Sequence, residues 1–148
     1  MTDPKRAFDR SFAAMCDAAD FEAAEDHLGH ALTDFYRLYE RAKHPPSSPA
    51  ARKTALEATG NGKAALAIAW VRTFHTHDVV EVSEASDIYS DYYTNLYGVL
   101  AWRPRSNFTS NPDGEGWHLF YDRYLEGRSV LDTLQTAVSA VVAVTPGP

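Results

Sequence analysis

Covalent and metal cross-links are largely missing from this sequence. It contains a single cysteine, Cys16, which excludes an intramolecular disulfide bond. No set of cysteines and histidines has the spacing of a zinc finger, so structural zinc is not expected. The most apolar segment, residues 137–144, is far shorter than the ~20 residues that a membrane helix requires. The N-terminus also lacks the apolar stretch of a secretion signal. These absences favour a cytoplasmic protein with no membrane partner.

An excess of positive charge is missing as well. The formal net charge is −6 and the isoelectric point is near 5.4. A protein that coats nucleic acid needs a basic face, so that mode of binding is not expected. A small site that contacts RNA only transiently remains compatible with this charge. The 148 residues, of which 45% are hydrophobic and 23% charged, fit one soluble globular domain, 1–148.

Capping signals divide the chain into a series of expected helices. Asp3-Pro4 opens the first helix, the second begins near Asp20, and Pro45-Pro46 stops it. Ser48-Pro49 opens a short third helix, and Asn61 is the expected cap of a fourth that begins near residue 62. These signals predict a helical first half.

The second half contains one segment of a different kind. Residues 87–105 mix tyrosines and β-branched residues with Gly98 and Pro104, which predicts a short strand or hairpin. Helical patterns return at residue 117, break at Gly127 and restart at Ser129 with an approximate capping box. The sequence therefore predicts an all-α bundle of four to five helices with a small β-hairpin or irregular insertion.

The segment WVRTFHTHDVVE, residues 70–81, concentrates side chains suited to phosphate chemistry. It holds Arg72, His75 and His77 within six residues. On a continuous helix Arg72 and His77 diverge by roughly 140°. They can therefore meet only if the helix ends or kinks between them, or if they line a cleft shared with another chain.

Arg72 and His77 also fit an R-x4-H motif, and two further segments follow it in order: AWRP at 101–104 and GRSVLDTL at 127–134. In this respect residues 62–140 resemble HEPN domains, and in particular small uncharacterised actinobacterial proteins of HEPN type. The resemblance implies a helical homodimer, and a metal-independent endoribonuclease that needs no cofactor. It also implies a toxin or phage-defence role, with RNA as a transient substrate and a protein inhibitor as an optional partner.

Two positions depart from the family pattern. The residue after the arginine is often Asn, Asp or His in the family, whereas this chain has Thr73, which retains a hydroxyl but not an amide. HEPN toxins controlled by a nucleotidyltransferase antitoxin typically carry a tyrosine two residues after the histidine, where this chain has Val79. That form of regulation is therefore not expected.

The implied chemistry suits the residue types. Cleavage by the neighbouring 2′-OH needs a group that moves protons near neutral pH and a cation that stabilises the phosphate. His77 would move the proton, and Arg72 would stabilise the charge because a guanidinium stays cationic. Thr73 and His75 would support them, His75 by binding phosphate or by replacing His77. Asp78 could orient an imidazole.

Other interpretations stay open for the same residues. His77 could be a hydrogen-bonded core histidine, and the domain could be a catalytically silent module that binds a protein partner. His75-x-His77-Asp78 is also typical of metal sites, but residues two apart on a helix face nearly opposite ways. The aromatic residues could stack unpaired bases, although packing against the bundle is the simpler role; they are Tyr89, Tyr92, Tyr93, Tyr97 and Trp102.

Overall fold

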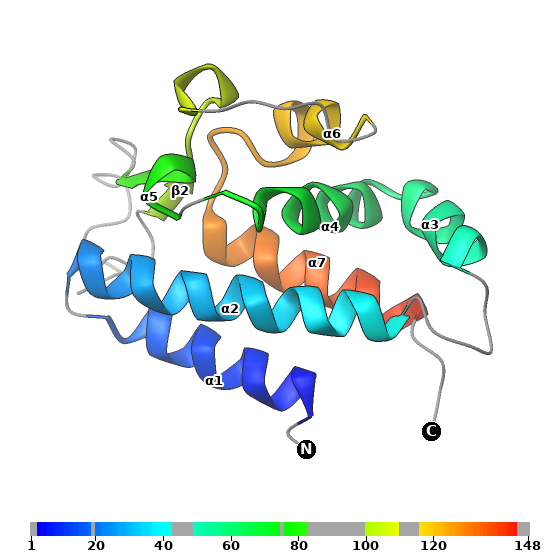
Figure 1. The fold of residues 1–148 in the computed structure, drawn as a ribbon, viewed down its shortest axis with the longest axis horizontal. Helices are drawn as coiled ribbons and strands as arrows, with labels where there is room; N and C mark the ends of the chain where they lie inside the picture. The colour runs from blue at the N-terminus through cyan, green and yellow to red at the C-terminus, as the bar shows by residue number, and fades with distance from the viewer. Residues whose placement is uncertain are drawn as a thin grey trace.

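A computed structural model describes residues 3–18, 20–42, 49–74, 76–82, 100–109 and 116–144 (Figure 1). The elements are α1 (Pro4–Cys16), α2 (Phe21–Ala42), α3 (Pro49–Glu57), α4 (Gly60–Val71), α5 (Thr76–Val79), β1 (Val80–Val82), β2 (Leu100–Trp102), a 3-10 turn η3 (Arg105–Asn107), α6 (Trp117–Tyr124) and α7 (Val130–Val144). The predicted helical bundle with a small β element is confirmed.

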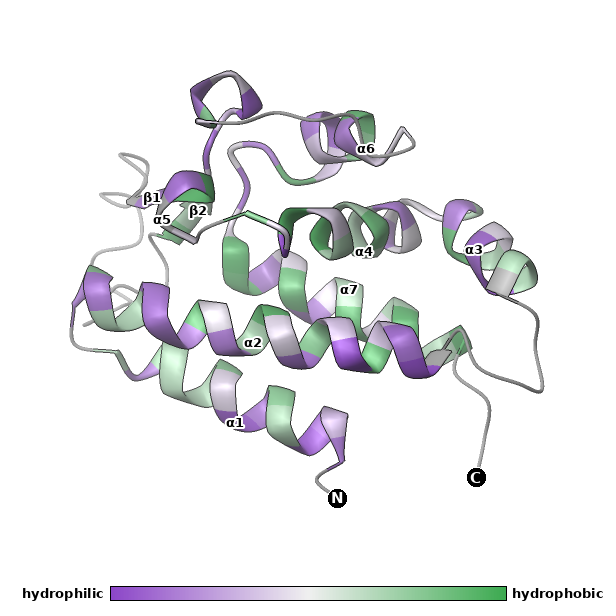
Figure 2. Ribbon diagram, viewed as in Figure 1, coloured by the Kyte–Doolittle hydropathy of each residue, from purple (hydrophilic) through white to green (hydrophobic). Residues whose placement is uncertain are grey.

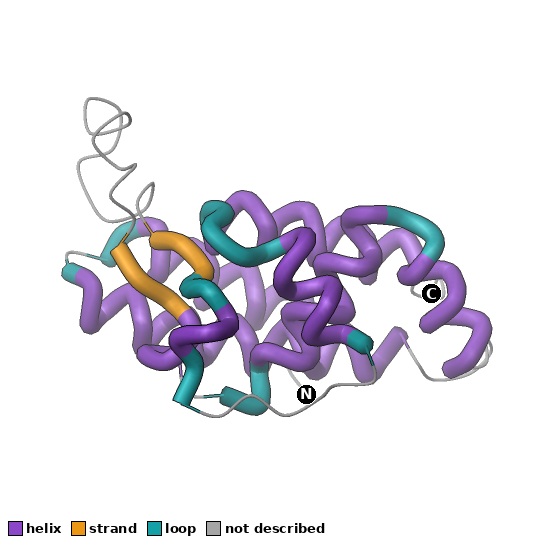
Figure 3. Tube along the Cα trace, turned by 90° about the horizontal axis from the view of Figure 1, so that it is seen from above, coloured by secondary structure: helices purple, strands orange, loops and turns teal. Residues whose placement is uncertain are grey.

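The helices form layers around α4. The first two helices lie side by side, and α4 packs against α6 on one side and α7 on the other (Figure 1). The view from above places the two short strands at one end of the bundle (Figure 3). Hydrophobic residues concentrate on α4 and α7, whereas hydrophilic residues are frequent on α1 and α2 (Figure 2). The long helices therefore supply the core, and the strands close one end of it.

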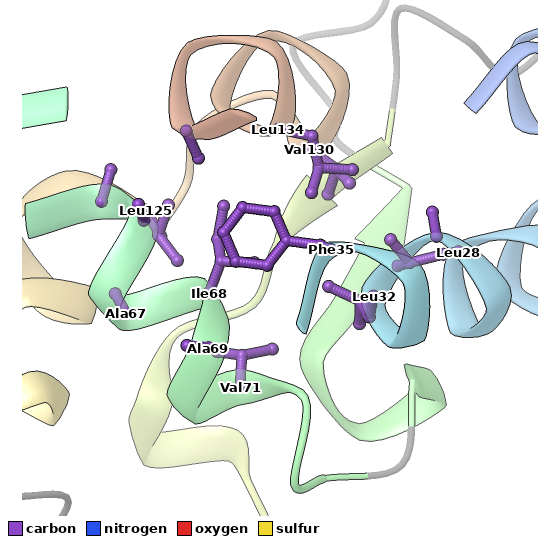
Figure 4. Packing of buried hydrophobic residues seen from close by; sticks show 14 of the residues in the cluster. Leu28, Leu32, Phe35, Ala67, Ile68, Ala69, Val71, Leu125, Val130 and Leu134 are labelled. Carbon is purple, nitrogen blue, oxygen red and sulfur yellow. The ribbon is translucent and has the colours of Figure 1, made fainter. Parts of the chain in front are cut away.

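Helix α4 is the centre of the hydrophobic core. Every side chain from Ala64 to Val71 is buried, which is the pattern of a helix surrounded by protein on all sides. Phe35 of α2, Ile68 of α4 and Leu134 of α7 lie in the interior that these helices share (Figure 4). The end of α4 is thus fixed by packing and not by helix propensity alone.

Local capping signals explain most helix starts. Asp3 caps α1 by accepting a hydrogen bond from the Lys5 amide at 3.1 Å, and Ser129 accepts one from the Asp132 amide at 3.2 Å. The predicted cap of the fourth helix, Asn61, is wrong. The hydroxyl of Thr59 accepts from the Gly62 amide at 2.9 Å, because α4 begins at Gly60 and already contains Asn61.

The strands pair antiparallel, with Val80 opposite Trp102. The indole of Trp102 is fully buried and donates to the hydroxyl of Thr133 at 2.7 Å, so this residue packs in the core and does not stack bases. Its backbone amide also donates to the carbonyl of Arg128 at 3.1 Å. The predicted strand is therefore confirmed at residues 100–102, while the four tyrosines between 89 and 97 lie outside the described residues.

Candidate functional site

The R-x4-H segment lies where α4 ends. Arg72 occupies the C-cap position, and its amide donates to the carbonyl of Ile68 at 3.1 Å. The amide of Phe74 closes the next turn by donating to the Val71 carbonyl at 2.9 Å, and a separate short helix, α5, starts at Thr76. A helix therefore does end between the two motif residues. The 140° divergence calculated for a continuous helix does not apply.

Of the two motif residues, Arg72 is the one whose side chain the structure describes. It is exposed, and its guanidinium carbon lies 4.0 Å from the ring centroid of Tyr36 in α2. This distance falls within the range of a cation–π interaction. Within the described part of the chain Arg72 makes no ion pair, so its charge is not neutralised by a neighbouring carboxylate.

The two supporting residues with described side chains make contacts inside the protein. The hydroxyl of Thr73 donates to the carbonyl of Trp70 at 2.8 Å, one of the last carbonyls of α4, which also accepts from the Thr73 amide at 3.2 Å. A carboxylate oxygen of Asp78 accepts from the hydroxyl of Thr109 at 3.1 Å. Asp78 therefore ties α5 to the segment that follows η3.

The histidines are placed only in part. His75 lies outside the described residues, and for His77 the structure describes the backbone, which belongs to α5. The preceding residue, Thr76, lies against α2, because a methyl group placed on Gly29 would be 3.7 Å from its Cγ2. Helix α2 thus contacts both ends of the segment, at Tyr36 near Arg72 and at Gly29 near Thr76.

These two contact points lie along one face of α2. Gly29 and Tyr36 are seven residues apart, which is about two turns or ~10 Å along a helix axis. Arg72 and the start of α5 therefore contact α2 at different positions along its axis. No sequence signal indicates the contact with Tyr36, since periodicity predicts which face of a helix is buried but not which side chain covers it.

The residues with described side chains form no metal-binding site. No group of three or more His, Cys, Asp or Glu residues among them is arranged to hold an ion. The interpretation of His75-x-His77-Asp78 as a metal site stays untested, because the two imidazoles are not described. In the same described ranges, no helix combines the length and the apolar character needed to cross a membrane.

Comparison of the chain with protein-family models, with curated proteins and with solved structures finds no match. The family resemblance therefore depends on the R-x4-H motif and on the two segments that follow it in the sequence. The structural observations on the candidate site are the end of α4 at Arg72, the start of α5 at Thr76 and the contact of Arg72 with Tyr36.

Proposed function

We propose that this protein is a metal-independent endoribonuclease of HEPN type that acts in the cytoplasm as a toxin or in defence against phage. The observation that carries the proposal is the exposed guanidinium of Arg72 at the end of an otherwise buried helix. Among the residues that the structure describes, Arg72 has no acidic partner, so its guanidinium can pair with an external anion. RNA phosphate is the anion that the motif implies.

In the proposed reaction the RNA supplies its own nucleophile. His77 removes the proton from a 2′-OH, the 2′ oxygen attacks the adjacent phosphorus, and the bond to the 5′ oxygen breaks. The departing 5′ oxygen takes up a proton from water, to which His77 later returns its own, and the other product ends in a 2′,3′-cyclic phosphate. Arg72 stabilises the negative charge that builds on the phosphate oxygens during this step. No metal or cofactor takes part.

A homodimer would complete the site. Arg72 and the start of α5 contact α2 about two helical turns apart, which favours a site shared between subunits. A twofold axis near α4 and α5 would bring Arg72 of one subunit toward His77 of its partner, and self-complementary pairing is the commonest form of homo-oligomer. A protein inhibitor would act by covering the exposed side chain of Arg72.

The second candidate function is a catalytically silent module that binds a protein partner. The hydroxyl proton of Thr73 is directed to the carbonyl of Trp70, so this residue does not donate to a substrate as an amide would. The net charge of −6 also favours a protein partner over RNA. These two observations make the alternative worth a direct test.

The deciding experiment is incubation of the purified protein with an end-labelled structured RNA in EDTA. We expect cleavage, products that end in a 2′,3′-cyclic phosphate, and no cleavage of a 2′-O-methyl RNA of the same sequence. Cleavage that EDTA abolishes would replace this proposal with the metal site. Intact RNA at every protein concentration, from a stable dimer, would favour the interaction module.

A further inference from the structure

The contact between Arg72 and Tyr36 is much closer than the other cation–aromatic contacts in the described ranges. The guanidinium carbon of Arg72 lies 4.0 Å from the ring centroid, whereas the remaining pairs are separated by 5.6 to 6.0 Å. A separation of 4.0 Å is close to van der Waals contact between stacked groups. Arg72 therefore rests on the ring of Tyr36, and is not merely near it.

The ring of Tyr36 is itself held by packing. It belongs to the 22-residue helix α2 and is half-buried. Its centroid lies 5.8 Å from that of Tyr39, which is buried and makes an edge contact with Trp117 at 6.2 Å. The surface under Arg72 thus belongs to an aromatic series that continues into the bundle.

We propose that Tyr36 is the positioning residue for Arg72 in the ribonuclease site, an inference that rests on the proposed function. An exposed arginine loses rotamer entropy when it is fixed, and stacking on a preformed ring offsets part of that cost. The contact is with the face of a ring that accepts no conventional hydrogen bond, so it uses none of the lone-pair acceptors that would otherwise occupy the N–H groups of Arg72.

A ring suits this role better than a carboxylate. An acidic partner would also fix the guanidinium, but it would occupy the N–H groups and neutralise the charge that the phosphate requires. An aromatic face attracts the cation through its quadrupole and carries no formal charge. Arg72 therefore keeps its charge for the substrate while its orientation is restricted.

The test compares Tyr36→Leu, which removes the ring, with Tyr36→Phe, which keeps it. We expect Tyr36→Leu to lower kcat for RNA cleavage by about 10- to 100-fold, because misplacement of a catalytic group by about 1 Å has effects of this size. Tyr36→Phe should restore most of the activity. Tyr124→Leu is the matched control, since it removes another ring near an arginine, that of Arg123 at 5.6 Å. The ring of Tyr124 lies beside Gly60 at the start of α4, at the opposite end of the helix from Arg72.

Two further measurements separate positioning from a purely structural role. In wild-type protein the ring current of Tyr36 should shift the NMR signals of the Arg72 side chain, and Tyr36→Leu should remove this shift while the melting temperature changes no more than in Tyr124→Leu. A kcat equal to that of the wild type in Tyr36→Leu would overturn the inference and leave the ribonuclease proposal intact.

Failure of the proposed function gives a different pattern. If wild-type protein cuts no RNA, the ribonuclease proposal is overturned, and binding of a fluorescent 2′-O-methyl RNA decides the role of Tyr36. Weaker binding by Tyr36→Leu that Tyr36→Phe restores would support the positioning of Arg72 for phosphate. Equal binding by all three proteins, or no binding at all, would overturn it.

Discussion

The Cα atom of Gly62 lies directly beside the backbone of Leu56, so close that a methyl group on it would come within 1.9 Å of the Leu56 carbonyl oxygen. The carbonyl carbon and Cα of Leu56 would be only 2.6 and 2.7 Å away. These two residues form the corner where α3 ends and α4 begins. Because the obstructing atoms are backbone, rotation of a side chain cannot relieve the clash.

Gly62→Ala should therefore be strongly destabilising, by about 3 kcal/mol or more, since the corner has to open before the methyl group fits. Gly29→Ala is the matched control. Its new methyl group would lie 3.7 Å from Thr76, an ordinary contact, and replacing glycine inside a helix stabilises by about 0.5–1 kcal/mol. Urea denaturation of both variants measures the two effects. Equal stability of the two proteins would contradict the tight corner.

The same corner shows why sequence reasoning succeeded at some helix ends and not at this one. Asp3 and Ser129 form caps that involve only residues two or three positions away, so their local signals were sufficient. At the start of α4 the contact with Leu56 sets where the helix begins, and Thr59 takes the position that the sequence assigned to Asn61. Packing between helices decided this end, and packing is not visible in local spacing.

The candidate site shows a similar limit. Residue types revealed the motif, and helical geometry predicted that Arg72 and His77 could meet only across a break in the helix or in a cleft shared with another chain. A break is present. The ring under Arg72 was not readable, because Tyr36 lies 36 residues earlier and meets it only through the packing of α2 against the end of α4. Long-range contacts of this kind follow from the tertiary fold.

The buried hydrogen bond between Trp102 and Thr133 gives a second prediction. Thr133→Val would leave the indole N–H without its acceptor inside the core, which costs about 1–3 kcal/mol of unfolding free energy. Thr136→Val, one turn further along α7, changes an exposed hydroxyl and should alter stability by no more than about 0.5 kcal/mol. Denaturant titrations followed by tryptophan fluorescence would distinguish them, and similar losses would argue against the importance of this bond.

A buried arginine provides a third prediction. Arg52 is only 3% exposed, its three guanidinium nitrogens have no hydrogen-bond partner in the described structure, and burial lowers its pKa. An unpaired charge is costly to bury, so Arg52→Met should raise the melting temperature. Lys53→Met, at the neighbouring half-exposed position, should change it little. A lower melting temperature in Arg52→Met would mean that the guanidinium makes favourable interactions in solution.

Stability should also fall at alkaline pH because of Tyr121. Burial, together with the charges of Glu126 and Asp122, raises the pKa of this phenol above its ordinary value of about 10. The unfolded chain then loses the proton more readily than the folded one, so the contribution of Tyr121 to stability is intact below pH ~10 and declines above it by about 1.4 kcal/mol per pH unit. Unfolding free energies measured by denaturant titration at a series of pH values, from neutral to above 10, would show this slope.

The comparison for this effect is Tyr121→Phe in a Cys16→Ala background. Burial and the adjacent Asp17 raise the pKa of Cys16 from 9.0 to about 11. Ionisation of this thiol therefore also lowers stability as the pH rises above about 9, and the Cys16→Ala background removes that effect. Tyr121→Phe loses the hydrogen bond to the carbonyl of Arg103, so it should be about 1 kcal/mol less stable at neutral pH but nearly insensitive to pH above 10. An unchanged alkaline slope would assign the effect to other groups.

Mixing two inactive variants tests whether the ribonuclease site is shared between subunits. Arg72→Ala and His77→Ala should each abolish cleavage with little change in melting temperature, while His75→Ala should lose less. A heterodimer of the first two variants would contain one site that lacks both residues and one that is intact. Because random exchange makes half of the dimers mixed, about a quarter of the wild-type activity should return if each site combines residues of both subunits. Complete inactivity of the mixture, with heterodimers demonstrated by mass spectrometry, would place both residues of each site in one subunit.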